Sequence, residues 1–161
     1  MNVLRHPSPA LKARASEIEP AADPALQQLV RAMAEAMYEE AGIGLAAPQI
    51  GVAKRVIVFD VDDNLAAVCN PVIVEASEET AVDEEGCLSV PGVTVPIERS
   101  VRVVCEGRTI EGKPITVDAE DLLARVLQHE IDHLDGILIL DRCPADIRKS
   151  VIKAYNEANR L

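Results

Sequence analysis

The chain has 161 residues, of which 48% are hydrophobic and 27% charged, a balance that is typical of one globular domain and excludes a disordered chain. Its formal net charge of −11 disfavours general binding to nucleic acid or to an anionic membrane, because so acidic a chain repels phosphate. The first ten residues hold no apolar run, so we expect no signal peptide, and no segment approaches the roughly 20 apolar residues that span a bilayer. We therefore expect a cytoplasmic protein that forms a single domain over residues 1–161.

The first predicted element is a helix that begins with Asp23 as its cap and Pro24 at its first position, and that ends at Gly42. Its apolar residues recur at helical spacing and should pack in the core: Leu26, Leu29, Val30, Met33 and Met37. Four later segments are rich in β-branched residues and predict strands at residues 56–59, 67–74, 101–105 and 115–117. A hairpin tip is predicted at residues 111–114.

A second helix is predicted from a cap at Asp118 to Gly136. Its apolar surface is broad, so this helix should be buried and central: Leu122, Leu123, Val126, Leu127, Ile131 and Leu134. Residues 137–140 predict a short buried strand, and a third helix should run from about Ala145 to Arg160. The order of elements indicates an α+β fold, with mixed or antiparallel sheets packed around the central helix and with an N-terminal and a C-terminal helix.

The four cysteines are even in number, which permits two disulfides, but in a chain without a signal peptide they favour a reduced protein. We interpret Cys69, Cys105 and Cys143 as small buried hydrophobic residues. Cys87 lies in a segment of different character, described below.

The central helix contains two histidines at positions i and i+4, His129 and His133, with Glu130 beside the first. Residues at this spacing share one helical face, so both imidazoles can reach one metal ion while the carboxylate stays outside the ligand set. A structural pair of histidines is the alternative. The metal site is favoured because these are two of only three histidines in the chain, and because a buried histidine needs a polar partner.

A catalytic metal normally takes three protein ligands, and Cys87 is the candidate for the third. It follows Gly86, which would let the backbone turn to present the thiolate. No His or Glu follows the helix at the spacing of a zinc endopeptidase, and Glu157 is predicted to lie in another helix. With a divalent ion, a Cys-His-His set would keep one positive charge that can polarise a carbonyl group.

Residues 42–49 combine glycines and alanines with Gln49, and such small residues allow another backbone or a substrate to approach closely. The Gln49 amide is a donor that does not titrate and suits an oxyanion. A phosphate-binding loop is the competing interpretation, but no Lys follows and the glycines end a helix instead of beginning one.

In this order, residues 42–49, 85–89 and 129–133 resemble the three motifs of peptide deformylases, and the resemblance covers nearly the whole chain from Leu4 onward. It implies a metal-dependent hydrolase that removes the N-formyl group from the N-terminal methionine of nascent polypeptides and releases formate. It implies that Cys87, His129 and His133 hold the metal. The physiological ion would be Fe(II), with Zn, Ni or Co also able to bind, and the donor types alone do not choose among them.

The resemblance also assigns roles around the metal. Glu130 would act as general base and then as general acid, while Gln49 and the backbone N–H of Leu88 would bind the oxyanion. Asp132 is interpreted as a structural hydrogen-bonding residue. The substrate would be lined by a further set, in which Leu122 and Val126 share the face of His129 and form the methionine pocket: Ile43, Gly44, Glu85, Leu122 and Val126.

Two segments raise separate expectations. Residues 93–99 look shorter than the corresponding family segment and lack its basic residue, so Arg99 is a weak substitute for contacts to the substrate backbone. Residues 141–161 hold five basic and three acidic side chains, which favours a helix that docks on the ribosome, as in some family members, or an ordinary solvated face. Neither a membrane partner nor sequence-specific binding to nucleic acid is expected.

Three other functions fit parts of the pattern. A zinc endopeptidase would use the same helix motif, but the Cys87 ligand and the missing downstream ligand argue against it. A non-catalytic metal-binding or ribosome-associated protein would not need Glu130 and Gln49. A deformylase that acts on a formylated small molecule would share every motif, and only the shape of the pocket would separate it from a peptide deformylase.

Overall fold

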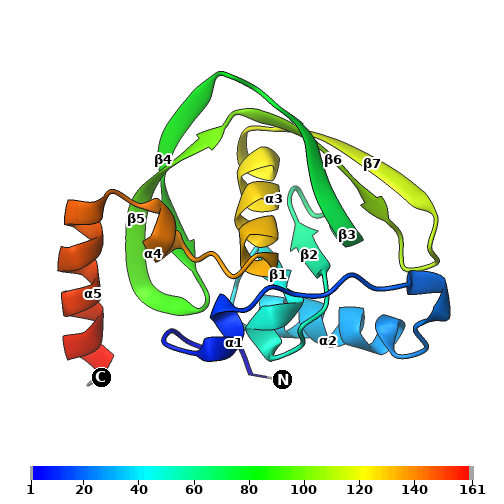
Figure 1. The fold of residues 1–161 in the computed structure, drawn as a ribbon, viewed down its shortest axis with the longest axis horizontal. Helices are drawn as coiled ribbons and strands as arrows, with labels where there is room; N and C mark the ends of the chain where they lie inside the picture. Colours follow the sequence, from blue (N-terminus) through cyan, green and yellow to red (C-terminus); the bar gives the residue numbers. More distant parts are fainter. Residues whose placement is uncertain (1, 160–161) are drawn as a thin grey trace.

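The computed structural model describes residues 2–159 and has an α+β fold, as the order of elements predicted (Figure 1). The helices are α1 (Pro9–Lys12), α2 (Leu26–Glu39), α3 (Asp121–Leu134), α4 (Ile139–Arg142) and α5 (Ala145–Asn159), with short 3₁₀ helices η1 (Pro20–Ala22) and η2 (Ala47–Ile50). The strands are β1 (Gly44–Ala46), β2 (Val56–Asp60), β3 (Leu65–Ala76), β4 (Thr80–Cys87), β5 (Val90–Ser100), β6 (Arg102–Arg108) and β7 (Pro114–Glu120).

The strands form two separate antiparallel sheets. One has five strands in the order β1-β2-β3-β6-β7, and the other consists of β4 and β5 alone. Figure 1 shows α3 upright in the middle of the fold, with the β4–β5 sheet on one side and the larger sheet on the other. The helix predicted to be central thus lies between the two sheets.

The first long helix, α2, is confirmed, but it begins at Leu26 and not at Pro24. Asp23 ends η1 and its carboxylate accepts a hydrogen bond from the N–H of Ala25 at 3.1 Å, so residues 23–25 form a turn before the helix. The predicted apolar stripe of α2 faces a core shared with β1 and β2, where Met33 and Met37 are fully buried.

The predicted start of the central helix is wrong. Asp118 lies in β7, which stays paired with β6 as far as Glu120, and the helix begins at Asp121. The Asp118 carboxylate instead binds Arg102 across the two strands, at 3.0 and 2.8 Å. The predicted end is close, since α3 ends at Leu134 and Gly136 adopts a left-handed conformation two residues later.

Residues 137–140 do not form the predicted strand, because the segment enters the short helix α4. The Asp141 carboxylate accepts a hydrogen bond from the Leu138 N–H at 2.8 Å and thereby caps the first turn. Ile139 and Leu140 are buried in a cluster with β5 and α5, so their burial comes from helix packing and not from a sheet.

The C-terminal helix α5 is confirmed as far as Asn159, while Arg160 lies outside the described residues. Tyr155 is buried on its inner face, and its hydroxyl donates to the carbonyl of His6 at 2.6 Å. Cys69, Cys105 and Cys143 are buried as expected, and each of the four cysteines is a free thiol. Within residues 2–159, we find no helix that combines the length and the apolar character needed to cross a bilayer.

Candidate metal centre

Three side chains from two parts of the fold converge on one point. Cys87 ends β4, just after the strand register shifts at Gly86, while His129 and His133 lie one turn apart on α3. Nε2 of His133 lies 3.3 Å from the Cys87 sulfur and 3.2 Å from Nε2 of His129, and the three donor atoms all fall within 4.8 Å of one another. One thiolate and two imidazoles so arranged fit a single divalent transition-metal ion.

The orientation of His129 is set by a buried carboxylate. Its Nδ1 donates to Oε1 of Glu85 at 2.9 Å, which leaves Nε2 facing His133 and the Cys87 sulfur. Carboxylates in this position fix the ring of a metal-binding histidine and raise its basicity. Burial opposes the charge on Glu85, but hydrogen bonds from His129 and Arg99 outweigh it and hold the pKa of this carboxyl well below its usual value.

The two imidazoles are perturbed in opposite directions. Burial lowers the pKa of His133 well below its usual value, and the nearby charges of His129 and Arg99 act in the same sense, so this ring is neutral. Burial also opposes the charge on His129, but the Glu130 carboxylate, Cys87 and Glu85 together raise the pKa of this histidine well above its usual value.

Glu130 lies beside the three donors without joining them. Its Oε2 is 4.0 Å from Nε2 of His129, and its Oε1 is buried without a hydrogen-bond partner among the described residues. Burial raises the pKa of Glu130 to about 7, with His129 opposing this shift and Glu85 reinforcing it. A carboxyl group with a pKa near neutrality can both accept and return a proton, which is the requirement for general acid–base catalysis.

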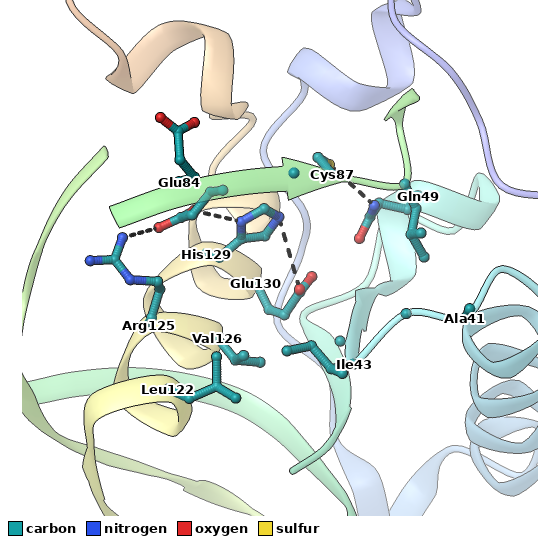
Figure 2. A pocket seen from close by; sticks show the side chains of 15 residues that line it. Ala41, Ile43, Gln49, Glu84, Cys87, Leu122, Arg125, Val126, His129 and Glu130 are labelled. Carbon is teal, nitrogen blue, oxygen red and sulfur yellow. Dashed lines mark hydrogen bonds and ion pairs between the residues drawn. The ribbon is translucent and has the colours of Figure 1, made fainter. Parts of the chain in front are cut away.

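Gln49 is held rigidly by its own neighbours. Its Oε1 accepts a hydrogen bond from the Ala46 N–H at 2.9 Å, and its Nε2 donates to the Ser89 hydroxyl at 3.1 Å and lies 3.8 Å from the Cys87 sulfur. The side chain is buried, so its N–H₂ group is fixed beside the predicted metal ligand (Figure 2).

A cavity of about 260 Å³ opens in front of these groups. Leu122 and Val126 from α3 face Ile43 across it, as Figure 2 shows, and Gly44, Glu85 and Leu88 also line its wall. Ile43 and Leu122 are half exposed at its mouth. All the residues predicted to bind metal or substrate, or to act in catalysis, therefore meet at one site, although the carboxylate of Glu85 is turned toward His129.

Arg99 does not occupy the predicted place near the substrate. The segment around it is not a loop but part of β5, and the side chain is buried, with only 6% of the residue exposed. Its guanidinium binds both carboxylate oxygens of Glu85 at 2.9 and 3.0 Å and also Asp132 at 2.6 Å. Asp132 is thus a structural hydrogen-bonding residue, as interpreted, and it also accepts two hydrogen bonds from Arg142.

Arg125 is part of the site, although no role was predicted for it from the sequence. Its Nη1 lies 2.5 Å from Oε2 of Glu85, and it lines the cavity beside His129 (Figure 2). The sequence does contain a signal for this residue. Arg125 lies four residues before His129 on a helix predicted to be buried, and a buried guanidinium requires hydrogen-bond partners.

Comparisons with known proteins point to one family. The family model described as polypeptide deformylase matches residues 1–149. The peptide deformylase of Pelotomaculum thermopropionicum is 50% identical over 144 residues, which cover 89% of this chain and 90% of the relative. That of Dictyoglomus thermophilum is 47% identical over 142 residues, covering 88% and 92%.

Solved structures match the fold over almost its full length. A crystal structure of peptide deformylase from Ehrlichia chaffeensis gives a TM-score of 0.92 at 33% identity and covers 99% of this chain and 97% of that one. The same protein in complex with actinonin gives 0.93 at 34% identity, covering 100% and 98%. The chain belongs to the polypeptide deformylase family, hydrolases that remove the N-formyl group from nascent polypeptides.

Proposed function

We propose that Cys87, His129 and His133 hold the single metal ion with which this protein deformylates the N-terminal methionine of nascent polypeptides. The observation that carries this proposal is the convergence of the three donor atoms within 4.8 Å at the wall of a cavity. Such an ion would act as a Lewis acid. It would polarise the formyl carbonyl and make water a better nucleophile near neutral pH. Fe(II) is the proposed physiological ion, while Zn, Ni and Co also suit a thiolate and two imidazoles.

Glu130 is the proposed proton carrier. It accepts a proton from water as the oxygen attacks the formyl carbon, and it returns that proton to the nitrogen as the C–N bond breaks. Formate and a free N-terminal amine are the products. Burial supports this role, since it raises the pKa of Glu130 to about 7 and so makes both transfers accessible near neutrality.

Gln49 and the backbone N–H of Leu88 are the proposed donors to the oxyanion that develops during the attack. The hydrogen bonds between Gln49 and its neighbours Ala46 and Ser89 fix the amide before substrate arrives. Fixed donors of this kind stabilise the transition state without having to reorganise during the reaction.

We propose that Leu122 and Val126 form the methionine pocket and that Ile43 and Gly44 line the path of the substrate beside it. Leu122, Val126 and Ile43 present apolar side chains to the cavity, and such side chains suit an unbranched thioether chain. Glu85 supports this site from behind through His129. We propose that actinonin, which is bound by the Ehrlichia chaffeensis enzyme, occupies the same cavity here.

The direct test is formate release from an N-formyl-methionyl peptide by protein prepared without oxygen and loaded with Fe(II) or Co(II). An N-acetyl peptide and the Glu130→Ala variant serve as controls. Release from the formyl peptide alone, lost in the variant, supports both the reaction and the proton carrier. No release by folded, fully metallated protein would contradict the proposal, and a parallel assay with formylated small molecules would show whether the pocket selects those instead.

We also propose that the protein acts in the cytoplasm, where ribosomes make its substrate, and that residues 1–161 form one catalytic domain. The outer surface of α5 is the proposed contact with the ribosome, because Lys149 and Lys153 are exposed one turn apart on this peripheral helix (Figure 1). Cosedimentation with ribosomes should weaken in a Lys149→Glu/Lys153→Glu double variant. Unchanged cosedimentation would mean that α5 presents an ordinary solvated face.

A further inference from the structure

Three polar residues of α3 that have no proposed part in the reaction lie along one side of the helix. Arg125, Gln128 and Asp132 are spaced at i, i+3 and i+7, so they form one stripe. Every member of this stripe forms a hydrogen bond with β5. The contacts run from Arg125 to the carbonyl of Ile97, from Gln128 to the backbone of Ser100, and from Asp132 to the side chain of Arg99.

Arg125 is the member of the stripe that reaches both strands of the small sheet. Its Nη1 donates to the Ile97 carbonyl of β5 at 2.9 Å and to Oε2 of Glu85 on β4 at 2.5 Å. Its Nη2 donates to the Ala81 carbonyl of β4 at 2.9 Å. The side chain is only 13% exposed, so its hydrogen bonds to Ile97 and Glu85 are partly buried, while the one to Ala81 is exposed.

These contacts matter because the metal ligands come from two bodies. Cys87 belongs to the β4–β5 sheet, which within residues 2–159 shares no backbone ladder with the five-stranded sheet, whereas His129 and His133 belong to α3. The separation between the thiolate and the imidazoles therefore depends on how the small sheet is fastened to α3. Figure 2 shows the Arg125 side chain joining these two bodies next to His129.

Arg125 also acts on His129 through a shared carboxylate. Oε2 of Glu85 accepts from both Arg125 and Arg99, while Oε1 accepts from Nδ1 of His129. Oε1 also accepts from Nη2 of Arg99, so loss of Arg125 would leave this carboxylate held by Arg99 and His129 alone.

We propose that Arg125 is a positioning residue of the metal centre, which fastens β4 to α3 and thereby sets the geometry of the Cys87 thiolate relative to the two imidazoles. The inference rests on the ligand set proposed above. Lysine cannot replace arginine here, because its single ammonium lacks the planar fork that reaches two carbonyls and a carboxylate together.

The test uses full-length protein reconstituted with Co(II). The visible spectrum of the bound Co(II) reports the geometry of its ligands, and competition with a chelator measures the affinity of the protein for Co(II). Wild type is compared with Arg125→Met, Arg125→Lys and the control Arg102→Met. Arg102 makes a bidentate pair with Asp118, but that pair is exposed and joins β6 to β7, away from the site.

Arg125→Met should shift the visible Co(II) bands and lower Co(II) affinity about 10- to 100-fold, the usual effect of losing an outer partner of a metal ligand. Its kcat should fall more than its KM for the formyl peptide rises. Arg125→Lys should fall between Arg125→Met and wild type, and Arg102→Met should match wild type in bands and affinity.

Arg125→Met with wild-type bands and affinity would overturn the inference, even if its melting temperature were lower, because Arg125 would then be only a structural residue. If Arg125→Met does not fold, Arg125→Lys decides by the same criterion. Wild-type protein without a thiolate-to-Co(II) charge-transfer band would overturn the proposed ligand set and this inference with it. If wild type shows the charge-transfer band and the Arg125 variants keep wild-type bands and Co(II) affinity, this inference is overturned while the proposed ligand set stands.

Discussion

Gly44 lies directly against Glu130, and a Cβ atom on residue 44 would stand 2.5 Å from the carboxylate oxygen Oε2. Gly44 is buried in β1, where it pairs with Phe59 of β2, so its backbone has little freedom to move away. A side chain at residue 44 would therefore displace the Glu130 carboxylate, which is the group that we propose carries the proton.

Gly44→Ala should lower kcat about 100-fold, because a displacement of about 1 Å at a catalytic group can cost that much in rate. Metal content should stay at the wild-type level, since Glu130 is not a proposed ligand. The matched control is the Gly44→Ala/Glu130→Ala double variant, which should be no less active than Glu130→Ala alone, because the added methyl group meets Glu130. Full activity in Gly44→Ala would show that Glu130 can move without loss of catalysis.

Cys87 should be the only thiol of the folded, metal-free protein that reacts rapidly at about pH 8. The other three cysteines are buried, and burial raises the pKa of Cys69 and Cys105 to about 11, so both stay protonated. A chromogenic thiol reagent should therefore titrate one group rapidly, and bound metal should protect it. The Cys87→Ser variant should lack the rapid phase, whereas equal rates with and without metal would argue against Cys87 as a ligand.

Gln49→Glu should lower kcat about 10²- to 10³-fold, which is typical for loss of one oxyanion donor. The carboxylate keeps an acceptor for the Ala46 N–H but loses the N–H₂ group that now donates to Ser89. Kinetic assays at matched metal content would separate this effect from altered metal binding. A change confined to KM would instead point to a role in binding the substrate.

Val126→Phe should reduce kcat/KM for a formyl-methionyl peptide about 10- to 100-fold, in the range of free energies by which apolar pockets discriminate side chains. Val126 lines the cavity opposite Ile43 and is 5% exposed, so a larger ring must enter the space proposed for methionine. Co(II) affinity serves as the control and should not change. Peptides with a smaller first residue should lose less activity than the methionyl peptide.

Features encoded within one segment were predictable from sequence. The two histidines sit one turn apart because helical periodicity puts residues i and i+4 on one face, and the same periodicity brings Val126 and Leu122 into the cavity. The stretches rich in β-branched residues gave β2, β3, β6 and β7.

Features that depend on distant partners were not predictable. Most of β4 is exposed and acidic, as at Asp83 and Glu84, so it lacks the alternation that marks a half-buried strand. Residues 137–140 are too short and too apolar for periodicity to separate a strand from a helix. The burial of Arg99 depends on Glu85 and Asp132, and the charge of an arginine does not reveal which carboxylates the fold will bring to it.

Deformylation by this protein should require one metal ion, held by Cys87, His129 and His133. The most direct measurement is a titration of anaerobic, metal-free protein with Co(II), in which formate release from an N-formyl-methionyl peptide is followed at each addition. Activity should start from zero and rise linearly to a break at one equivalent, and the His133→Ala variant should show no such rise. Full activity before any metal is added, or none after one equivalent has bound, would contradict the account.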